Sequence, residues 1–120
     1  MAQILVVDDS AFQRSILKKV IESAGHSVIE APNGREGIEK ATALKPGLIT
    51  MDLLMPDMSG QETLMEMNKL GLKIPTVIIS ADIQESTKKD CMNLGAVGFI
   101  NKPLQGPSIE ALINLIRCYL

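Results

Sequence analysis

The sequence has no tryptophan and few aromatic residues of any kind, with two phenylalanines and one tyrosine among 120 residues. Aromatic side chains are the usual stacking platforms for bases and flavin rings, so neither ligand is expected. Basic clusters are missing too, because no basic run is longer than the pairs Lys18–Lys19 and Lys88–Lys89. With a net charge of −2 and no basic patch, we expect no binding to nucleic acid.

Long apolar runs are also absent. The longest stretches hold four or five residues, as in ILVV at 4–7, whereas a membrane span needs roughly 18 or more. The start of the chain, MAQILVVDDS, lacks a positive leader and turns acidic where a signal peptide would still be apolar. Cys91 and Cys118 have no CxxC spacing and are expected to be buried apolar residues, not a disulfide or a metal pair. No membrane contact and a reducing, cytoplasmic location are therefore expected.

The composition that remains is typical of a globular protein, with 46% hydrophobic and 22% charged residues. A chain of this length predicts a single domain covering residues 1–120, with one main hydrophobic core. Because aromatics are scarce, aliphatic residues and seven methionines must fill that core.

Short apolar runs recur along the chain, and we expect each to form a strand: ILVV (4–7), SVIEA (27–31), GLITM (47–51), PTVIIS (75–80) and AVGFI (96–100). The segments between them have helical spacing. In the first segment the apolar side is formed by Phe12, Ile16, Leu17, Val20, Ile21 and Ala24. Gly25, Gly71 and Gly95 stand where helices would end, and Pro107 suits the first turn of the last helix.

The order of these elements, strand then helix five times over, predicts the α/β fold class. Several of the strands are continuously apolar rather than alternating, which is typical of parallel strands buried on both faces. A (βα)5 doubly wound, five-stranded parallel sheet with helices on both faces is the simplest architecture that fits.

Polar residues follow several of the expected strands. They are Asp8 and Asp9 after the first strand, Asp52 after the third, Ser80 at the end of the fourth, and Asn101 and Lys102 after the fifth. The second strand delivers only Glu30, Ala31 and Pro32. Because ligands bind beyond the carboxyl ends of the strands in an open parallel sheet, we expect the polar group to meet at that edge.

Taken one at a time, these residues have ordinary structural explanations. Asp8, Asp9 and Ser10 could cap the first helix, Ser80 could cap a later one, and Lys102 could be a solvated charge. Three carboxylates brought together, however, repel one another unless a cation lies among them. Oxygen ligands without histidine or cysteine favour Mg²⁺, which binds through one or two carboxylates and phosphate oxygens. The sequence therefore predicts a magnesium site and a phosphoryl substrate.

Phosphoryl transfer assigns a task to each of these residues. Asp52 is the candidate nucleophile, because a carboxylate can accept a phosphoryl group as an acyl phosphate. Lys102 supplies a point charge for phosphate oxygens, and the hydroxyl of Ser80 can donate a hydrogen bond to them. Asp8 and Asp9 would hold the ion.

Four stretches resemble the receiver domain of two-component response regulators, in the right order and over the whole chain. They are VVDDS with Arg14 five residues after Asp9, MDLLMPDMSG, VIISAD and GFINKP. The resemblance implies the strand order 2-1-3-4-5 and phosphorylation of Asp52 by a histidine kinase. It also implies Mg²⁺ binding by Asp9, Asp52 and the backbone carbonyl of Leu54, with Asp8 acting mostly through water.

The same resemblance implies how phosphorylation becomes a signal. Ser80 and Lys102 would contact the phosphoryl oxygens, the Lys102-Pro103 bond would be cis, and Phe99 would be a switch residue with outward and inward rotamers. The surface formed by the helix at 83–94, the strand at 96–100 and the helix from Pro107 would change and bind a partner. Serine at position 80 in place of the commoner threonine, and phenylalanine at 99 in place of tyrosine, remove neither role.

The two helices of that surface have different apolar patterns. The helix at 83–94 has a thin stripe made of Ile83, Thr87, Cys91 and Leu94, so little burial anchors it. The last helix is broader, with a core stripe of Ile109, Leu112, Ile113 and Ile116 that Leu115 and Tyr119 widen. Such a helix is either well buried at one edge or part of a partner surface.

A chain ending at Leu120 leaves no length for an output module, so we expect a stand-alone signalling protein that is not an enzyme beyond its own phosphorylation and dephosphorylation. It would be a chemotaxis regulator that binds a flagellar switch protein, or a phosphorelay shuttle that passes phosphate to a histidine-phosphotransfer protein. A phosphatase could also act on it.

Other interpretations fit the residues less well. A magnesium-dependent phosphatase of the haloacid dehalogenase type needs an aspartate two residues after the nucleophile, where this sequence has Leu54. A flavodoxin-like FMN module needs a hydroxyl-rich phosphate loop after the first strand, where this sequence has DDS. A receiver-like module used only for protein binding would not need the intact acidic set.

Overall fold

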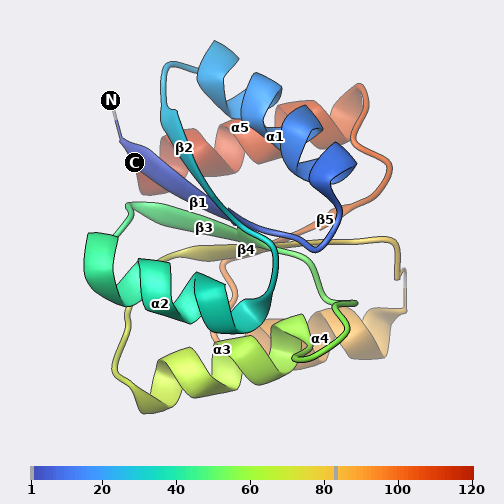
Figure 1. Ribbon diagram of the computed structural model, residues 1–120. Coiled ribbons are helices and arrows are strands. Elements are labelled where there is room, and N and C mark those ends of the chain that lie inside the picture. Colours follow the sequence, from blue (N-terminus) through green and yellow to red (C-terminus); the bar gives the residue numbers. More distant parts are fainter. Residues whose placement is uncertain (1, 83) are drawn as a thin grey trace.

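The computed structural model describes residues 2–82 and 84–120 (Figure 1). Five strands alternate with five helices in this part of the chain, which confirms the α/β class. The elements are β1 (Gln3–Val7), α1 (Ala11–Ser23), β2 (Ser27–Ala31), α2 (Gly34–Leu44), β3 (Leu48–Met51), α3 (Gly60–Lys69), β4 (Thr76–Ser80), α4 (Glu85–Asn93), β5 (Gly98–Asn101) and α5 (Pro107–Tyr119).

All five strands lie parallel in one sheet, in the order β2-β1-β3-β4-β5. Helices α1 and α5 cover one face of the sheet, and α2, α3 and α4 cover the other (Figure 1). The predicted doubly wound sheet with the order 2-1-3-4-5 is therefore confirmed. None of the described helices has both the length and the apolar character that crossing a membrane requires.

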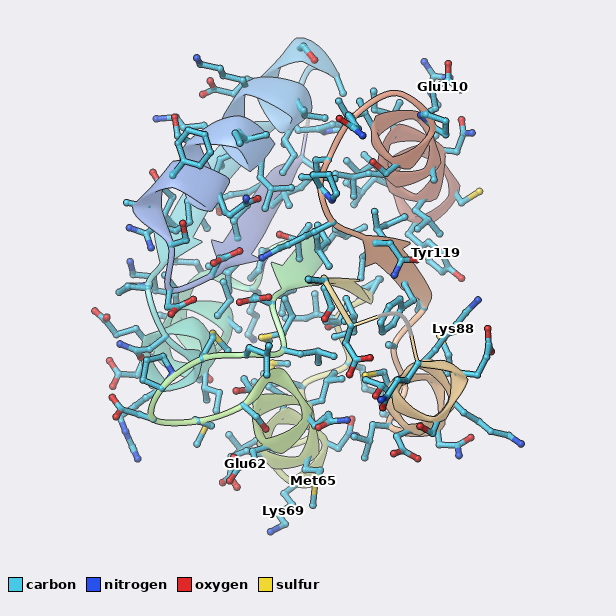
Figure 2. The ribbon with its side chains drawn as sticks, turned by 90° about the vertical axis from the view of Figure 1, so that its right-hand side faces the viewer. Glu62, Met65, Lys69, Lys88, Glu110 and Tyr119 are labelled. Carbon is cyan, nitrogen blue, oxygen red and sulfur yellow. The ribbon has the colours of Figure 1, made fainter. Side chains whose placement is uncertain are left out.

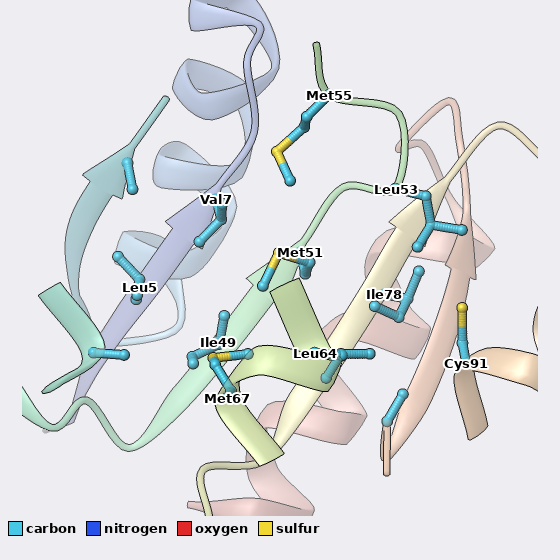
Figure 3. Close-up of a cluster of buried hydrophobic side chains, with 13 residues drawn as sticks. Leu5, Val7, Ile49, Met51, Leu53, Met55, Leu64, Met67, Ile78 and Cys91 are labelled. Atoms are coloured by element: carbon cyan, nitrogen blue, oxygen red, sulfur yellow. The ribbon is translucent and has the colours of Figure 1, made fainter. Parts of the chain in front are cut away.

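The hydrophobic core has two parts, one on each face of the sheet. Leu5 and Val7 of β1 belong to the cluster under α2, α3 and α4 (Figure 3), whereas Ile4 and Val6 belong to the cluster under α1 and α5. Alternate residues of one strand thus point to opposite buried faces, which explains the continuously apolar strands of the sequence. Full burial of one such side chain stabilises the fold by about 1.5–3 kcal/mol relative to its exposure.

Local signals fix the segment that follows β3. Ser59 and Glu62 form a capping box at the start of α3, in which each side chain accepts a hydrogen bond from the other residue's backbone N–H at 3.1 Å. Gly60 lies against the backbone of Asp52 and Leu53, and a side chain at position 60 would collide with the carbonyl of Asp52. The loop behind Asp52 therefore requires glycine at this point.

Two predictions about buried side chains are wrong. Phe12 was expected on the apolar side of the first helix but is 72% exposed, whereas Leu17 and Ile21 are buried. At 3.6 residues per turn, Phe12 lies about 140° around the helix from Leu17, so the two cannot both face the sheet. Cys91 is buried as expected, but Cys118 is exposed near the end of α5.

The pattern of the last helix is only partly as predicted. Leu112 and Ile116 are buried, but Ile113 stays outside the core cluster, and Leu115 packs against Gly98 of β5 in its place. The missing side chain of Gly98 makes room for Leu115. On α4 the buried residue is Cys91, so the thin stripe is confirmed for the described residues, and Ile83 lies outside them.

Candidate functional site

The carboxyl ends of β1 and β3 bring the predicted acidic residues together. Val7 and Met51 are paired at the ends of these strands, and the backbone N–H of Asp52 donates to the carbonyl of Val7 at 2.9 Å. Asp52 itself stands between Met51 and Leu53, and both neighbours are buried in the cluster under α2, α3 and α4. Two apolar anchors thus hold the backbone of Asp52 at the edge of the sheet. Figure 2 views the molecule from this edge.

Three carboxylates meet at this edge, as the strand ends predicted. Asp8, Asp9 and Asp52 each offer an oxygen atom, and these atoms all lie within 4.8 Å of one another. Asp8 and Asp52 are only 1% and 7% exposed, whereas Asp9 is exposed. The oxygen atoms of two buried carboxylates and one exposed carboxylate thus form a group that is open to solvent at Asp9.

Lys102 follows β5 and reaches this group across the end of β4. Its Nζ lies 3.1 Å from Oδ1 of Asp52 and 3.2 Å from Oδ2 of Asp8. The backbone N–H of Lys102 donates to the carbonyl of Ser80 at 2.8 Å, and the Lys102-Pro103 peptide bond is cis, as the resemblance implied. The ammonium therefore bridges the two buried carboxylates.

Burial and charge shift the pKa values of this group. Burial raises the pKa of the Asp52 carboxyl above its ordinary value of 3.8, Asp8 raises it further, and Lys102 only partly offsets both. Burial lowers the pKa of Lys102, but the attraction of Asp52 and Asp8 outweighs this effect, so the pKa ends above 10.5. One ammonium is too little positive charge for three carboxylates.

The donor set fits a hard divalent cation. It consists of carboxylate oxygens close enough to share one ion, and negative charge exceeds positive charge around them. Mg²⁺ accepts oxygen ligands and commonly keeps several waters, which the open side at Asp9 would admit. The three carboxylates therefore fit a bound Mg²⁺ ion better than they fit a site without a cation, where they repel one another.

Ser80 is buried at the end of β4, and its Oγ accepts a hydrogen bond from the backbone N–H of Asp82 at 3.1 Å. It does not cap α4, whose N-cap residue is Gln84. The carboxylate of Asp82 instead accepts hydrogen bonds from the backbone N–H of Gln84 and from the hydroxyl of Thr87, both at 2.8 Å. A short chain of hydrogen bonds thus leads from Ser80 to the first turn of α4.

The remaining predicted residues lie around this centre. Leu54 is 74% exposed in the loop after Asp52, and Phe99 of β5 is half-buried against the cluster under α2, α3 and α4. Asn101 is exposed, and its amide donates to the carbonyl of Asp82 at 3.5 Å. The metal contact of the Leu54 carbonyl and the switch role of Phe99 stay predictions.

Arg14 was named only as part of the resemblance and Glu30 only as a residue of the second strand, so their contact at the site was not predicted. Nη1 of Arg14 donates to the backbone carbonyl of Asp8 at 2.7 Å, and Nε of Arg14 lies 3.0 Å from Oε1 of Glu30. Glu30 stood at the end of the second strand without an evident partner. Only the pairing of β1 with β2, which places Val6 opposite Glu30, brings it next to the first helix.

Comparison with known proteins agrees with this geometry. The family model of the response regulator receiver domain matches residues 4–114. Chemotaxis protein CheY of Thermotoga maritima is 38% identical over 95% of this chain and 96% of its own length. A protein-glutamate methylesterase/protein-glutamine glutaminase of Treponema denticola is 41% identical over 84% of this chain but only 28% of its own length. The chain therefore belongs to the response regulator receiver domain family.

The fold agrees with a solved structure of the same kind. The structure of Vibrio cholerae chemotaxis protein CheY4 matches with a TM-score of 0.89 and 28% identity, covering 100% of this chain and 99% of that one. Receiver domains of this type are signalling switches of two-component systems and not classical enzymes. The resemblance seen in the sequence is confirmed, and the phosphatase and FMN-binding interpretations lose their support.

Proposed function

We propose that residues 1–120 form a single receiver domain that acts as a phosphorylation-activated switch in the cytoplasm. Asp52 would accept a phosphoryl group from a histidine kinase in a Mg²⁺-dependent reaction. The observation that carries this proposal is the position of Asp52, buried beside Asp8 and Asp9 with the ammonium of Lys102 at 3.1 Å. Membership of the receiver family supports it.

Asp9, Asp52 and the backbone carbonyl of Leu54 would hold the Mg²⁺ ion, and Asp8 would contribute mostly through water. When bound, Mg²⁺ neutralises part of the carboxylate charge and of the charge on phosphoryl oxygens. Lys102 already balances part of that charge, since it contacts both Asp8 and Asp52. The site is thus prepared for an anionic group that the carboxylates alone would repel.

The chemical step transfers one phosphoryl group between two side chains. An Oδ atom of Asp52 attacks the phosphorus of a phosphohistidine, a P–O bond forms as the P–N bond breaks, and the departing imidazole takes up a proton. Lys102 is placed to balance charge on the phosphoryl oxygens, and Ser80 can turn its hydroxyl proton toward one of them. Asp52 is only 7% exposed, and we expect the donor to approach it along the exposed rim at Asp9.

The phosphoryl group adds about −1.5 to −2 charges to an acidic site and would draw Ser80 and Lys102 toward it. Movement of Ser80 would act on Asp82, whose N–H it binds, and through Asp82 on α4. Cys91 is the buried residue among the described positions of α4, so little apolar surface opposes a shift of that helix. Rearrangement of α4, with rotation of Phe99 on β5, would then change the α4–β5–α5 surface.

The partner of that surface would be a flagellar switch protein, which makes this a chemotaxis-type regulator. The support is the role of similar proteins, because chemotaxis proteins from Thermotoga maritima and Vibrio cholerae match nearly the whole chain. Binding of the beryllofluoride-activated protein to flagellar switch peptides tests this output. Preferential binding to a histidine-phosphotransfer domain would indicate a phosphorelay shuttle instead.

Labelling with acetyl phosphate tests the phosphorylation itself. With Mg²⁺ present, intact mass should increase by one phosphoryl group, and peptide mapping should place it on Asp52. Asp52→Asn and addition of EDTA should abolish the label. Asp57→Asn is a matched control, because Asp57 is an exposed aspartate of the same loop. Label on another residue, or label that persists in Asp52→Asn, would refute the proposal.

A further inference from the structure

An ion pair between α1 and β2 contacts the backbone that carries the acidic residues. The guanidinium of Arg14 is directed at two acceptors at once, the carbonyl of Asp8 at 2.7 Å and Oε1 of Glu30 at 3.0 Å. The side chain of Arg14 is 16% exposed and that of Glu30 is 40% exposed. A pair at the surface adds little stability by itself, so its position beside Asp8 is the more informative property.

The bond from Arg14 completes a set of contacts that fix Asp8. The backbone N–H of Asp8 donates to the carbonyl of Ala31 at 3.1 Å, which extends the pairing of β1 with β2 by one step. Oδ1 of Asp8 accepts from the N–H of Ser10 at 2.9 Å, and Oδ2 accepts from Lys102. The carbonyl of Asp8 lies beyond the last residue of β1, and Arg14 supplies its donor.

The position of Asp9 depends on the contacts that fix the carbonyl of Asp8. The planar peptide group that contains the Asp8 carbonyl also contains the nitrogen of Asp9, so a donor that fixes the carbonyl fixes where Asp9 begins. Asp9 is itself exposed and contributes the outermost of the three carboxylates. A side chain at the rim binds a metal more tightly if its backbone is already held in place, because less ordering is then needed on binding.

Glu30 orients the guanidinium of Arg14. The guanidinium is a planar fork, and with Nε bound to Glu30 it presents Nη1 to the Asp8 carbonyl. The backbone carbonyl of Glu30 accepts a hydrogen bond from Nζ of Lys40, which ties that end of β2 to α2. An arginine paired in this way is also less free to turn toward the carboxylate of Asp9 and compete with a cation.

We propose that Arg14, oriented by Glu30, is a positioning residue for the divalent-cation site. It holds the Asp8 carbonyl so that the carboxylates of Asp8 and Asp9 are preset around the ion. This inference rests on the proposed function, because it assumes that the acidic group binds a divalent cation.

A purely electrostatic role of Arg14 and a positioning role predict opposite effects of its removal on cation binding, which makes the proposal testable. If Arg14 acted only as a nearby positive charge, Arg14→Gln would tighten cation binding and Arg14→Lys would leave it unchanged. If Arg14 acts by position, both variants weaken binding, because neither reproduces the fork that reaches Asp8 and Glu30 together. Loss of a residue that orients metal ligands typically weakens metal binding by about tenfold or more.

The experiment titrates each purified protein with Mn²⁺, following the electron paramagnetic resonance signal of the free ion, and repeats the titration with competing Mg²⁺. We expect Arg14→Gln and Arg14→Lys to weaken binding about tenfold, and Glu30→Gln to weaken it less. Arg117→Gln removes an arginine from the last turn of α5 and should bind like the wild type. In acetyl phosphate labelling, the Mg²⁺ concentration for half-maximal rate should rise more than the maximal rate falls.

Equal or tighter Mn²⁺ binding by Arg14→Gln, or wild-type binding by Arg14→Lys, would overturn the proposal. If circular dichroism shows that the Arg14 variants are unfolded, the Mn²⁺ titration of Glu30→Gln becomes the deciding test. Unchanged Mn²⁺ binding by that variant then overturns the proposal. A wild-type protein that binds no Mn²⁺ overturns it as well. A wild-type protein that binds Mn²⁺ but is not labelled at Asp52 refutes the proposed function, while the Mn²⁺ titrations still judge the role of Arg14.

Discussion

Nζ of Lys102 lies 3.1 Å from Oδ1 of Asp52, although 50 positions separate the two residues in the sequence. β4 lies between β3, which leads to Asp52, and β5, which leads to Lys102, so the lysine side chain reaches across the end of β4. The same ammonium contacts Asp8 at 3.2 Å. A single lysine thus pairs with two buried carboxylates, whereas the third carboxylate, Asp9, forms no ion pair within residues 2–82 and 84–120, and this imbalance has measurable consequences.

Asp52→Asn should stabilise the metal-free protein. The folded state raises the pKa of Asp52, so it binds this proton more tightly than the unfolded chain does, and the ionised carboxylate lowers the free energy of unfolding. Each unit of pKa difference corresponds to about 1.4 kcal/mol. We expect Asp52→Asn to melt a few degrees higher in EDTA at pH 7. The difference should shrink as the pH falls through the raised pKa towards 3.8.

Thermal unfolding with Mg²⁺ supplies the control for that measurement. An ion among the carboxylates offsets their repulsion and binds the wild type more tightly than Asp52→Asn. Added Mg²⁺ should therefore raise the melting temperature of the wild type more than that of the variant. A variant that melts below the wild type in EDTA would show that Asp52 is not destabilising.

Lys102→Met should destabilise the fold and slow labelling of Asp52. Asp8 and Asp52 would lose their ammonium partner while still buried, at a cost of roughly 1–3 kcal/mol. Because the folded state raises the pKa of Lys102, the stabilisation is complete below 10.5 and is lost as the pH rises through the higher folded-state value. Urea unfolding at several pH values checks this, with Lys69→Met, an exposed lysine of α3, as the control. Equal stability of Lys102→Met and the wild type at pH 7 would contradict it.

Gly60→Ala should damage both stability and phosphorylation. A methyl group at position 60 would meet the carbonyl of Asp52 and the backbone of Leu53, so the loop carrying Asp52 must shift. Forcing a methyl group into such a contact costs roughly 1–3 kcal/mol. Met65→Ala, at an exposed position of the same helix, should change neither property. The prediction fails if Gly60→Ala is labelled by acetyl phosphate at the wild-type rate and unfolds at the same urea concentration.

Asp82→Ala should loosen the start of α4 without any phosphorylation. The variant loses the acceptor of two hydrogen bonds, from the N–H of Gln84 and the hydroxyl of Thr87, and the loss of such a bond costs about 1 kcal/mol. Hydrogen exchange should show faster exchange of α4 amides and unchanged exchange in β1 and β3. Glu85→Ala removes an exposed carboxylate from the same turn as a control. Unchanged protection of α4 would argue that Asp82 does not connect Ser80 to this helix.

The sequence predicted the sheet and the meeting of Asp8, Asp9 and Asp52, because apolar strands with polar ends leave few parallel arrangements. It did not predict that Phe12 is exposed, since two apolar stripes on the first helix fit the helical period equally well and only packing on the sheet selects Leu17 and Ile21. The contact between Arg14 and Glu30 was missed for a related reason. It depends on the direction in which the Arg14 side chain leaves α1, which the strand order alone does not specify.

Leu54→Asn tests how long the phosphoryl group persists. The side chain of Leu54 is 74% exposed and follows Asp52 by two residues, so it is expected near the path of a water that would attack the acyl phosphate. An apolar group there cannot hold such a water, whereas an amide can. We expect autodephosphorylation of Leu54→Asn to be about tenfold faster, below the roughly 100-fold or more that a general base contributes. Decay of labelled protein in Mg²⁺ after removal of acetyl phosphate measures it. Leu70→Asn, which changes a 56% exposed leucine just after α3, should decay like the wild type. Equal rates for Leu54→Asn and the wild type would mean that water reaches the acyl phosphate by another route.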